Sequence, residues 1–247
     1  NNLNSDDNDY NINSQLEKLI EQNNEINYLN NSIKKVEINN NILHQNRIVK
    51  NIWTTHINKS IQDKIYYKYK SWEINTDWDF YLYSFEDMND FFEIEYFRKL
   101  KYNKEKTTIW KYYILYKYGG LYTDINKNFN INLNNFIPPN ATFVAFIDKD
   151  TISTSTIYSN KQSTIFKYAI NSILNILNNN KNVSLKTIVN DKTFTNIFVN
   201  TIQELLNNNN IKFIHLKNLY KHTTLNKKLN KLGIYIYSKQ YFNNFIS

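Results

Sequence analysis

The chain has 247 residues, of which 41% are hydrophobic and 16% aromatic, so it holds enough apolar material for one packed domain with an appendage. It contains no cysteine, which excludes a disulfide framework, a thiolate metal site and a thiol nucleophile. Its formal net charge of +8 suits an anionic partner, but the cations are dispersed rather than clustered. A solvated basic surface is the simpler interpretation, and no nucleic-acid partner is expected.

Targeting signals are not evident in the sequence. No run approaches the ~18 apolar residues of a membrane span, and no signal-peptide pattern is present. The chain begins with Asn rather than Met, which is compatible with a membrane anchor having been removed from the N-terminus. The sequence therefore leaves the compartment unknown.

Residues 1–45 differ in texture from the rest of the chain. A polar start is followed, over residues 15–38, by apolar residues near helical spacing that are interrupted by Asn. We expect one or two amphipathic helices here, which either pack on the domain or mediate self-association. The domain boundaries predicted from composition are thus a polar and helical extension at 1–45 and a folded domain at 46–247.

The domain alternates between extended and helical patterns. The sequence predicts strands at 47–53, 79–84, 119–125, 141–147, 211–216 and 233–238, and helices at 60–74, 88–100, 106–118, 165–177 and 194–206. Strands that alternate with helices predict an α/β sheet sandwich with parallel character.

Two of the three glycines in the chain stand together in "YGGLYTDIN". Gly119 fits the left-handed position that ends a helix, and Gly120 fits a tight turn into a strand. In an extended strand, Tyr122, Asp124 and Asn126 would share one face, where two side-chain oxygens can converge on a divalent cation. The alternative is a solvated turn with local side-chain hydrogen bonds, which is common in an Asn-rich chain.

The segment "YILYKYGGLYTDIN", together with the upstream "RIVKNIWTTHINKSIQDKIYYKYKSWEINTDWDFYLYS", resembles glycosyltransferase family 32. This group of DXD-containing sugar-nucleotide-binding enzymes is related to the large glucosylating bacterial toxins. The resemblance covers roughly residues 47–137. It implies a GT-A-like fold, in which a single Rossmann-like mixed sheet is flanked by helices, here with an N-terminal helical extension.

The resemblance also implies roles for particular residues. Trp53 would stack on the nucleotide base, Asp124 would contact ribose or sugar hydroxyls and the metal, and Asn126 would stand at the second metal ligand. The implied donor-binding set is Trp53, Thr108, Lys111, Gly120, Tyr122 and Asp124; the implied catalytic residues are Asp124 and Lys111. The implied cofactor is Mn²⁺ or Mg²⁺, the donor is a UDP- or GDP-linked sugar, and the acceptor is a glycan or a protein.

The chain departs from the family pattern at three of these positions. Asn126 replaces an aspartate and so removes a negative charge from the metal site. Lys111 replaces an arginine and keeps the charge without the bidentate fork, while Thr108 replaces an aspartate. The family's later T-G-P segment is replaced by "NDKTFT", residues 190–195.

Three functional hypotheses follow from these patterns. The first is a metal-dependent glycosyltransferase that moves a hexose with retention of configuration. The second is a weakly active or inactive relative that binds nucleotide or glycan, or scaffolds a partner. The third is an unrelated basic α/β interaction module. Asp148 and Asp150 would also reach the sheet edge, as an acceptor-site base or as a solvated pair, and the four histidines show no metal-ligand spacing.

Overall fold

The computed structural model describes residues 48–57, 63–91, 103–179, 190–206 and 223–247. The strands are β1 (Asn51–His56), β2 (Asp79–Ser84), β3 (Gly120–Thr123), β4 (Phe143–Asp148), β5 (Thr151–Ser159) and β6 (Ile234–Ser238). The α-helices are α3 (Asp63–Lys70), α4 (Phe85–Phe91), α6 (Asn103–Tyr118), α7 (Thr164–Asn179), α9 (Asp191–Leu205), α10 (Thr223–Lys231) and α11 (Lys239–Asn243). Short 3-10 helices follow α3 at Ser71–Ile74 and lie at Leu133–Asn135.

The strands form one mixed sheet of six strands in the order β2-β1-β3-β5-β4-β6. β1 pairs in parallel with both β2 and β3, and β4 pairs in parallel with β6. β5 runs antiparallel to its neighbours β3 and β4. The carboxyl ends of β1, β2 and β3 therefore meet at one edge of the sheet, where open α/β sheets bind ligands.

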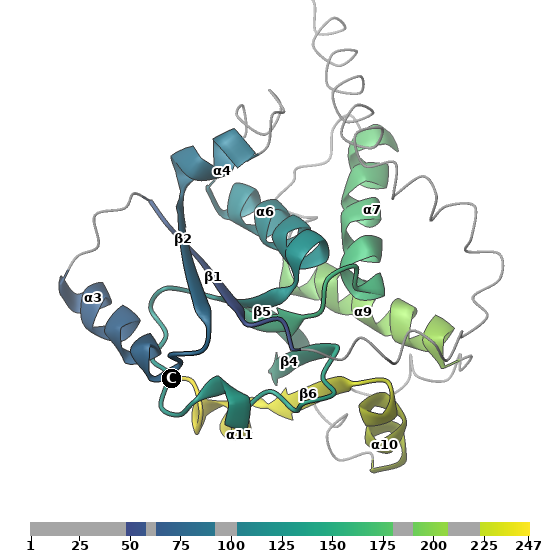
Figure 1. The fold of residues 1–247 in the computed structure, drawn as a ribbon. Helices are drawn as coiled ribbons and strands as arrows, with labels where there is room; N and C mark the ends of the chain where they lie inside the picture. The colour runs from purple at the N-terminus through teal and green to yellow at the C-terminus, as the bar shows by residue number, and fades with distance from the viewer. Residues whose placement is uncertain (1–47, 58–62, 92–102, 180–189, 207–222) are drawn as a thin grey trace, which may run out of the picture.

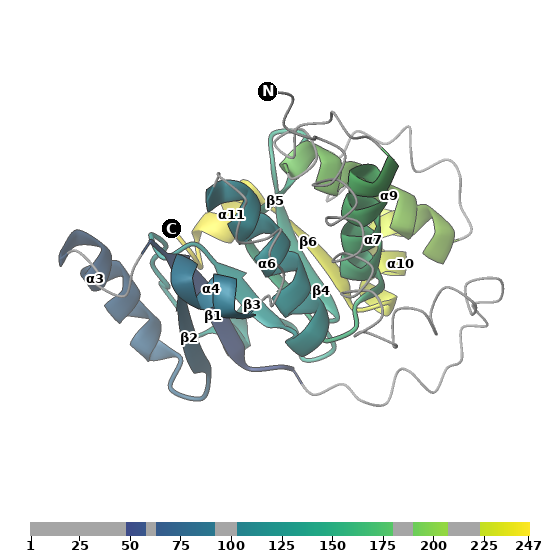
Figure 2. The same cartoon turned by 90° about the horizontal axis from the view of Figure 1, so that it is seen from above.

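Alternation along the strands sends side chains into two cores (Figures 1 and 2). Trp53 of β1 and Tyr122 of β3 face the layer of helices α6, α7 and α9. Their neighbours Ile52 and Leu121 face the opposite core, together with Trp72 of the 3-10 helix after α3. Burial on both faces explains why the central strands are apolar at consecutive positions.

Most of the predicted elements are confirmed, including the strands at 79–84 and 233–238 and the helices at 106–118, 165–177 and 194–206. The prediction missed β5, whose Thr- and Ser-rich sequence lacks the usual apolar pattern. Two of its buried hydroxyls, those of Thr154 and Thr156, have partners on other elements, as in the 2.9 Å hydrogen bond between Thr123 and Thr156. The predicted helices within 15–38 and the predicted strand at 211–216 lie outside the described residues, as does most of the predicted helix at 88–100.

The glycine pair adopts the backbone predicted for it. Gly119 has φ +70° and its N–H donates to the carbonyl of Leu115, which closes α6. Gly120 has φ +104°, and a Cβ built there would lie 2.5 Å from the Asn51 carbonyl oxygen. The two glycines thus allow α6 to end and β3 to enter the sheet directly beside β1.

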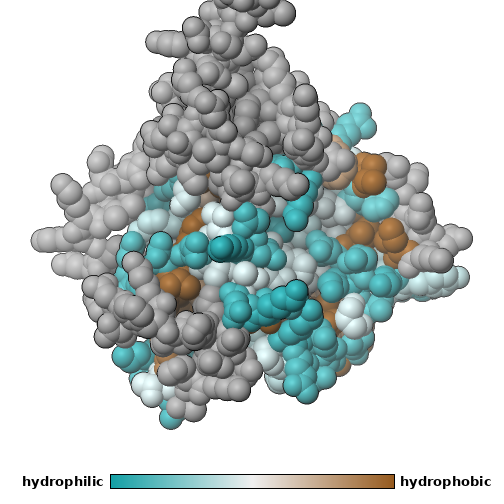
Figure 3. Space-filling model, turned by 180° about the vertical axis from the view of Figure 1, so that it is seen from behind, coloured by the Kyte–Doolittle hydropathy of each residue, from teal (hydrophilic) through white to brown (hydrophobic). Residues whose placement is uncertain are grey.

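Hydrophobic residues are scattered over the one face of the surface that Figure 3 shows. On the face shown in Figure 3, the described hydrophobic residues form small separate groups among hydrophilic ones. None of the helices in the described ranges combines the length and the hydrophobicity that a membrane span needs.

Candidate functional site

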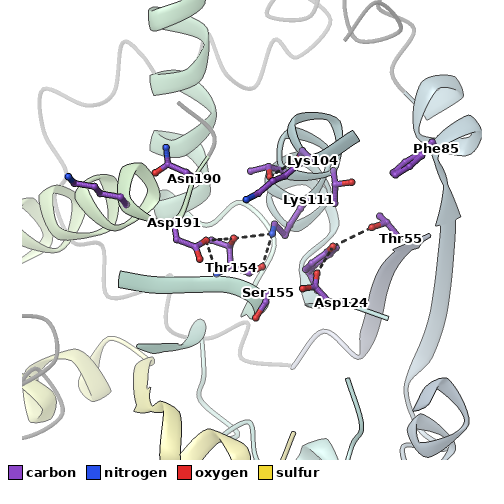
Figure 4. Close-up of a pocket in the computed structure, with 13 residues that line it drawn as sticks. Thr55, Phe85, Lys104, Lys111, Asp124, Thr154, Ser155, Asn190 and Asp191 are labelled. Atoms are coloured by element: carbon purple, nitrogen blue, oxygen red, sulfur yellow. Dashed lines mark hydrogen bonds between the residues drawn. The ribbon is translucent and has the colours of Figure 1, made fainter. Parts of the chain in front are cut away.

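A cavity of about 710 Å³ lies at the carboxyl edge of β1 and β3, between α6 and the beginning of α9. Its walls come from six parts of the fold (Figure 4): Thr55 on β1, Phe85 on α4, four residues of α6, Tyr122 and Asp124 at the end of β3, Thr154 and Ser155 on β5, and Asn190 to Lys192 at the start of α9. This volume falls within the range of cavities that hold small-molecule ligands and cofactors, about 300–1,000 Å³.

Asp124 is the residue that directly follows β3. Its backbone N–H donates to the carbonyl of Ser155 at 2.9 Å, and its Oδ1 accepts the hydroxyl of Tyr122 at 3.1 Å. Burial raises the pKa of the Asp124 carboxyl, while the charge of Lys111 and the hydrogen bond from Tyr122 act in the opposite direction. The carboxylate is thus partly desolvated and held in a fixed orientation.

Tyr122 connects the two sides of the pocket. Its hydroxyl lies 3.3 Å from that of Thr55 and donates to Asp124, so Thr55 supplies a proton to the Tyr122 oxygen. The ring lies beneath the ammonium of Lys111, with 4.5 Å between Nζ and the ring centroid. Burial raises the pKa of the Tyr122 phenol, so this side chain acts as a neutral hydrogen-bond donor.

Lys111 is a buried cation, with 5% of its surface exposed. Its Nζ donates to the carbonyl oxygen of Thr154 at 2.6 Å and to the Thr154 hydroxyl at 3.1 Å. Burial lowers the pKa of Lys111 to about 8, although the carboxylates of Asp124 and Asp191 favour its charged form. A positive charge in this position favours anions, because little water remains to screen it.

Asp191 approaches Lys111 through Thr154. The Thr154 hydroxyl donates to Asp191 Oδ1 at 2.7 Å, and the Thr154 backbone N–H donates to the same oxygen at 3.3 Å. Asn190 caps α9 by accepting the Thr193 N–H at 2.9 Å. The first turn of α9 is thereby held against β5 (Figure 4).

Four residues predicted from the resemblance line this pocket: Thr108, Lys111, Tyr122 and Asp124. The hydroxyl of Thr108 donates to the carbonyl of Lys104 on its own helix, at 2.8 Å. Gly120 does not line the pocket. Its lack of a side chain makes room for Trp53 Nε1, which would lie 2.9 Å from an added Cβ.

Trp53 differs from its expected placement. It lies on the same face of the sheet as Tyr122, its partner in register, but is 4% exposed and does not line the pocket. Its ring stacks on Tyr81, with 4.4 Å between the centroids, and its Nε1 donates to the Gly119 carbonyl at 2.7 Å. The expected open ring face is therefore covered, because the strand-end Trp has neighbours on both β2 and α6.

Asn126 also departs from the expected geometry. β3 ends at Thr123 and the chain turns, with the Lys127 N–H donating to the Asp124 carbonyl at 3.1 Å. Asn126 is exposed in this turn and does not line the pocket, so the extended strand on which its prediction as a metal ligand relied ends before it. Strand alternation ends where the backbone leaves the sheet.

The residues at the site offer one carboxylate, that of Asp124, to a divalent ion bound at the end of β3. Within the described residues, no group of three or more His, Cys, Asp or Glu side chains is arranged to hold a metal ion. Mg²⁺ is commonly bound by one or two carboxylates together with substrate phosphates, so Asp124 fits the role of a single protein ligand. Of the two other carboxylates predicted at the sheet edge, Asp148 pairs with Lys239 at 2.8 Å and Asp150 is exposed.

The sequence analysis missed Thr154, Asp191 and the two further pocket lysines, Lys104 and Lys192. A local signal existed for Asp191, because Asn190 before a helical pattern is a typical cap and an acidic residue favours the first turn. No local signal connects residue 191 to residue 111, because the fold alone brings them together.

Comparisons with known proteins bear on this architecture. A family model described as glycosyltransferase sugar-binding region containing DXD motif matches residues 10–144, which is more than half of the 247 residues. The solved structure of PaToxG glycosyltransferase is similar with a TM-score of 0.51 and 16% identity, covering 93% of this chain and 90% of that chain. No curated protein matches the chain. The structural likeness supports the mixed α/β glycosyltransferase fold predicted from the sequence.

Proposed function

Because the chain belongs to the glycosyltransferases whose sugar-binding region contains a DXD motif, we propose that it transfers a hexose from a nucleotide-sugar donor to a glycan or protein acceptor. The observation that carries this proposal is the meeting of Lys111 and Asp124 in one pocket at the carboxyl edge of the sheet. A buried ammonium beside a carboxylate suits the two halves of such a donor, an anionic diphosphate and a sugar with hydroxyl groups.

Each side chain has a distinct part in the proposed reaction. The Lys111 ammonium faces the diphosphate and stabilises the negative charge that grows on it as the glycosidic bond breaks. Asp124 accepts hydrogen bonds from sugar or ribose hydroxyls, with its orientation set by Tyr122. Lys104 and Lys192, which also line the pocket, add positive potential for the leaving group.

Mn²⁺ or Mg²⁺ is the cofactor we propose. Asp124 would hold it together with the donor phosphates, and the ion would supply Lewis-acid stabilisation of the leaving diphosphate. Asn126, the second metal ligand that the resemblance implies, is exposed in the turn beyond Asp124 and does not line the pocket. The proposed metal dependence therefore rests on one protein carboxylate.

We also propose that transfer retains the anomeric configuration, as the resemblance implies. Such a reaction needs the acceptor hydroxyl held close to the anomeric carbon on the donor's own face. We further propose that the nucleotide base stacks on Trp53. This stacking requires Tyr81 to move off the Trp53 ring. Tyr81 is 38% exposed, so its outer edge already faces solvent.

A weakly active or inactive nucleotide-binding protein is the second candidate, and the position of Asn126 favours it. With an amide in place of a carboxylate at residue 126, the end of β3 binds a hard divalent ion more weakly. Donor binding and donor turnover distinguish the two candidates.

The test is a thermal-shift panel of UDP- and GDP-sugars with Mn²⁺ and with chelator, followed by measurement of donor hydrolysis. Stabilisation by one donor together with its hydrolysis supports the transferase, and stabilisation without hydrolysis supports the inactive binder. Absence of both, with Asp124→Ala unchanged from the unaltered chain, would overturn the assignment of this pocket as the donor site.

A further inference from the structure

Lys111 is attracted by two carboxylates that reach it from different parts of the fold. Asp124 stands at the end of β3 and Asp191 in the first turn of α9, and both favour the charged form of Lys111. Lys104, on the same helix as Lys111, acts in the opposite direction. A buried ammonium between two carboxylates has two alternative partners. Its hydrogen bonds determine which of the two it interacts with.

In the structure, the hydrogen bonds to Thr154 direct the Lys111 ammonium toward Asp191. The Lys111 ammonium donates to both oxygens of Thr154, and the Thr154 hydroxyl in turn donates a hydrogen bond to Asp191. The hydrogen bonds all run in one direction, from the Lys111 ammonium to the Thr154 hydroxyl and from that hydroxyl to the Asp191 carboxylate. They form a continuous chain from the cation to the anion. Figure 4 shows this chain on the β5 side of the pocket, with Asp124 on the other side of Lys111.

Asp191 is itself held firmly. Its backbone carbonyl accepts the Thr195 hydroxyl at 2.6 Å, and that hydroxyl also accepts the Ile152 N–H of β5 at 2.8 Å. The positive end of the α9 dipole further favours a carboxylate in the first turn. The anion is therefore fixed to the sheet before any ligand enters.

We infer that Asp191 and Thr154 are positioning residues that hold the Lys111 ammonium on the β5 side of the pocket and so prevent it from pairing directly with Asp124. This inference rests on the proposed function, in which Lys111 meets the diphosphate and Asp124 meets the sugar and the metal. Without Asp191, a desolvated ammonium either releases its proton or moves to the remaining carboxylate. Both outcomes remove groups that the donor needs.

The chain offers variants that separate this role from a purely structural one. Asp191→Asn keeps a side-chain oxygen for Thr154 but removes the charge. Thr154→Val removes the hydroxyl with little change of shape, while Thr154→Ser keeps it. Asp148→Asn is the control, because it removes a carboxylate from an exposed ion pair with Lys239 elsewhere on the sheet.

The first measurement needs no ligand. The Nζ signal of Lys111 in ¹H–¹⁵N spectra, assigned with Lys111→Met, reports the hydrogen bonding of the ammonium and its place over the Tyr122 ring. We expect it to shift or to vanish through faster proton exchange in Asp191→Asn and Thr154→Val, and to be retained in Thr154→Ser and Asp148→Asn. A signal that is the same in all four variants would overturn the inference.

The second measurement is a double-mutant cycle on nucleoside diphosphate binding, with UDP and GDP titrated calorimetrically in Mn²⁺. We expect Asp191→Asn to weaken binding about tenfold, and to have almost no further effect in the Lys111→Met background. An equal loss in both backgrounds would show that Asp191 acts independently of Lys111. If neither nucleotide binds the unaltered chain, the proposed function fails, and the Lys111 signal still decides the positioning role.

Discussion

The ammonium of Lys111 lies over the ring of Tyr122, with 4.5 Å between Nζ and the ring centroid, while the hydroxyl of the same ring donates to Asp124. One aromatic side chain thus contacts the cation with its face and the anion with its edge. The two charges are held near each other without a direct ion pair. This arrangement keeps both available to a ligand and supplies part of the energy that burying them costs.

Two substitutions at Tyr122 separate these contacts. Tyr122→Phe removes the hydrogen bond to Asp124 and keeps the ring, so we expect a loss of about 1 kcal/mol in the free energy of unfolding and weaker metal-dependent donor binding. Tyr122→Leu also removes the ring under Lys111, and we expect a larger loss of stability. Denaturant titrations and donor binding check this. Equal effects of the two substitutions would show that the ring face contributes nothing.

The charge of Lys111 predicts how the protein responds to pH. Its pKa of about 8 in the folded protein lies below the ordinary lysine value of 10.5, so the unfolded chain binds more protons between these two values. The titration of Lys111 therefore makes the free energy of unfolding rise with pH across this window. We expect the stability of Lys111→Met, measured against the unaltered chain from pH 7 to 10, to lack this rise.

Donor binding should respond to the same proton in the opposite direction. As Lys111 loses its charge above about pH 8, the attraction for a diphosphate declines, so nucleotide affinity should fall as pH rises. Lys111→Arg should move this fall to higher pH, because a guanidinium stays charged. An affinity that is independent of pH from 7 to 10 in both proteins would exclude Lys111 from the anion site.

The turn after β3 predicts an unequal effect of substitutions at its two polar positions. Asp124→Ala should abolish metal-dependent donor binding, because it removes the carboxylate at the end of β3. Asn126→Asp should change that binding less than about twofold, because its exposed side chain adds a screened charge outside the pocket. Donor titrations with Mn²⁺ and with chelator check both. A marked gain in Mn²⁺-dependent affinity for Asn126→Asp would mean that the turn rearranges to bring residue 126 to the metal.

Gly120 carries a prediction about stability. A Cβ there would lie 2.5 Å from the carbonyl oxygen of Asn51 and 2.9 Å from Trp53 Nε1, at a backbone φ of +104°. We expect Gly120→Ala to lower the free energy of unfolding by about 2 kcal/mol or more, since it adds both strain and a clash with backbone. Lys228→Ala, on an exposed position of α10, is the control that should have little effect.

The features of this protein that depend on neighbouring residues in the chain could be predicted from the sequence. Helical spacing over residues 106–118, the glycine pair that follows and the short apolar strands are read from neighbours in the chain, and these predictions are confirmed. That segment, together with the upstream stretch from residue 47, predicted the family, and the resemblance named Asp124 and Tyr122, both of which line the pocket.

Other features depend on where the backbone turns and on which side chains cover a residue. These features are evident only from the tertiary structure. The alternation rule placed Asn126 beside Asp124, but the backbone leaves the sheet after Thr123, and a strand pattern cannot show its own end. Trp53 was expected to offer an open face, but Tyr81 from the neighbouring strand covers it. The link from Lys111 through Thr154 to Asp191 joins three elements that are far apart in sequence. Its polar residues carry no periodic signal, because hydrogen bonds across a fold are selected by position in space.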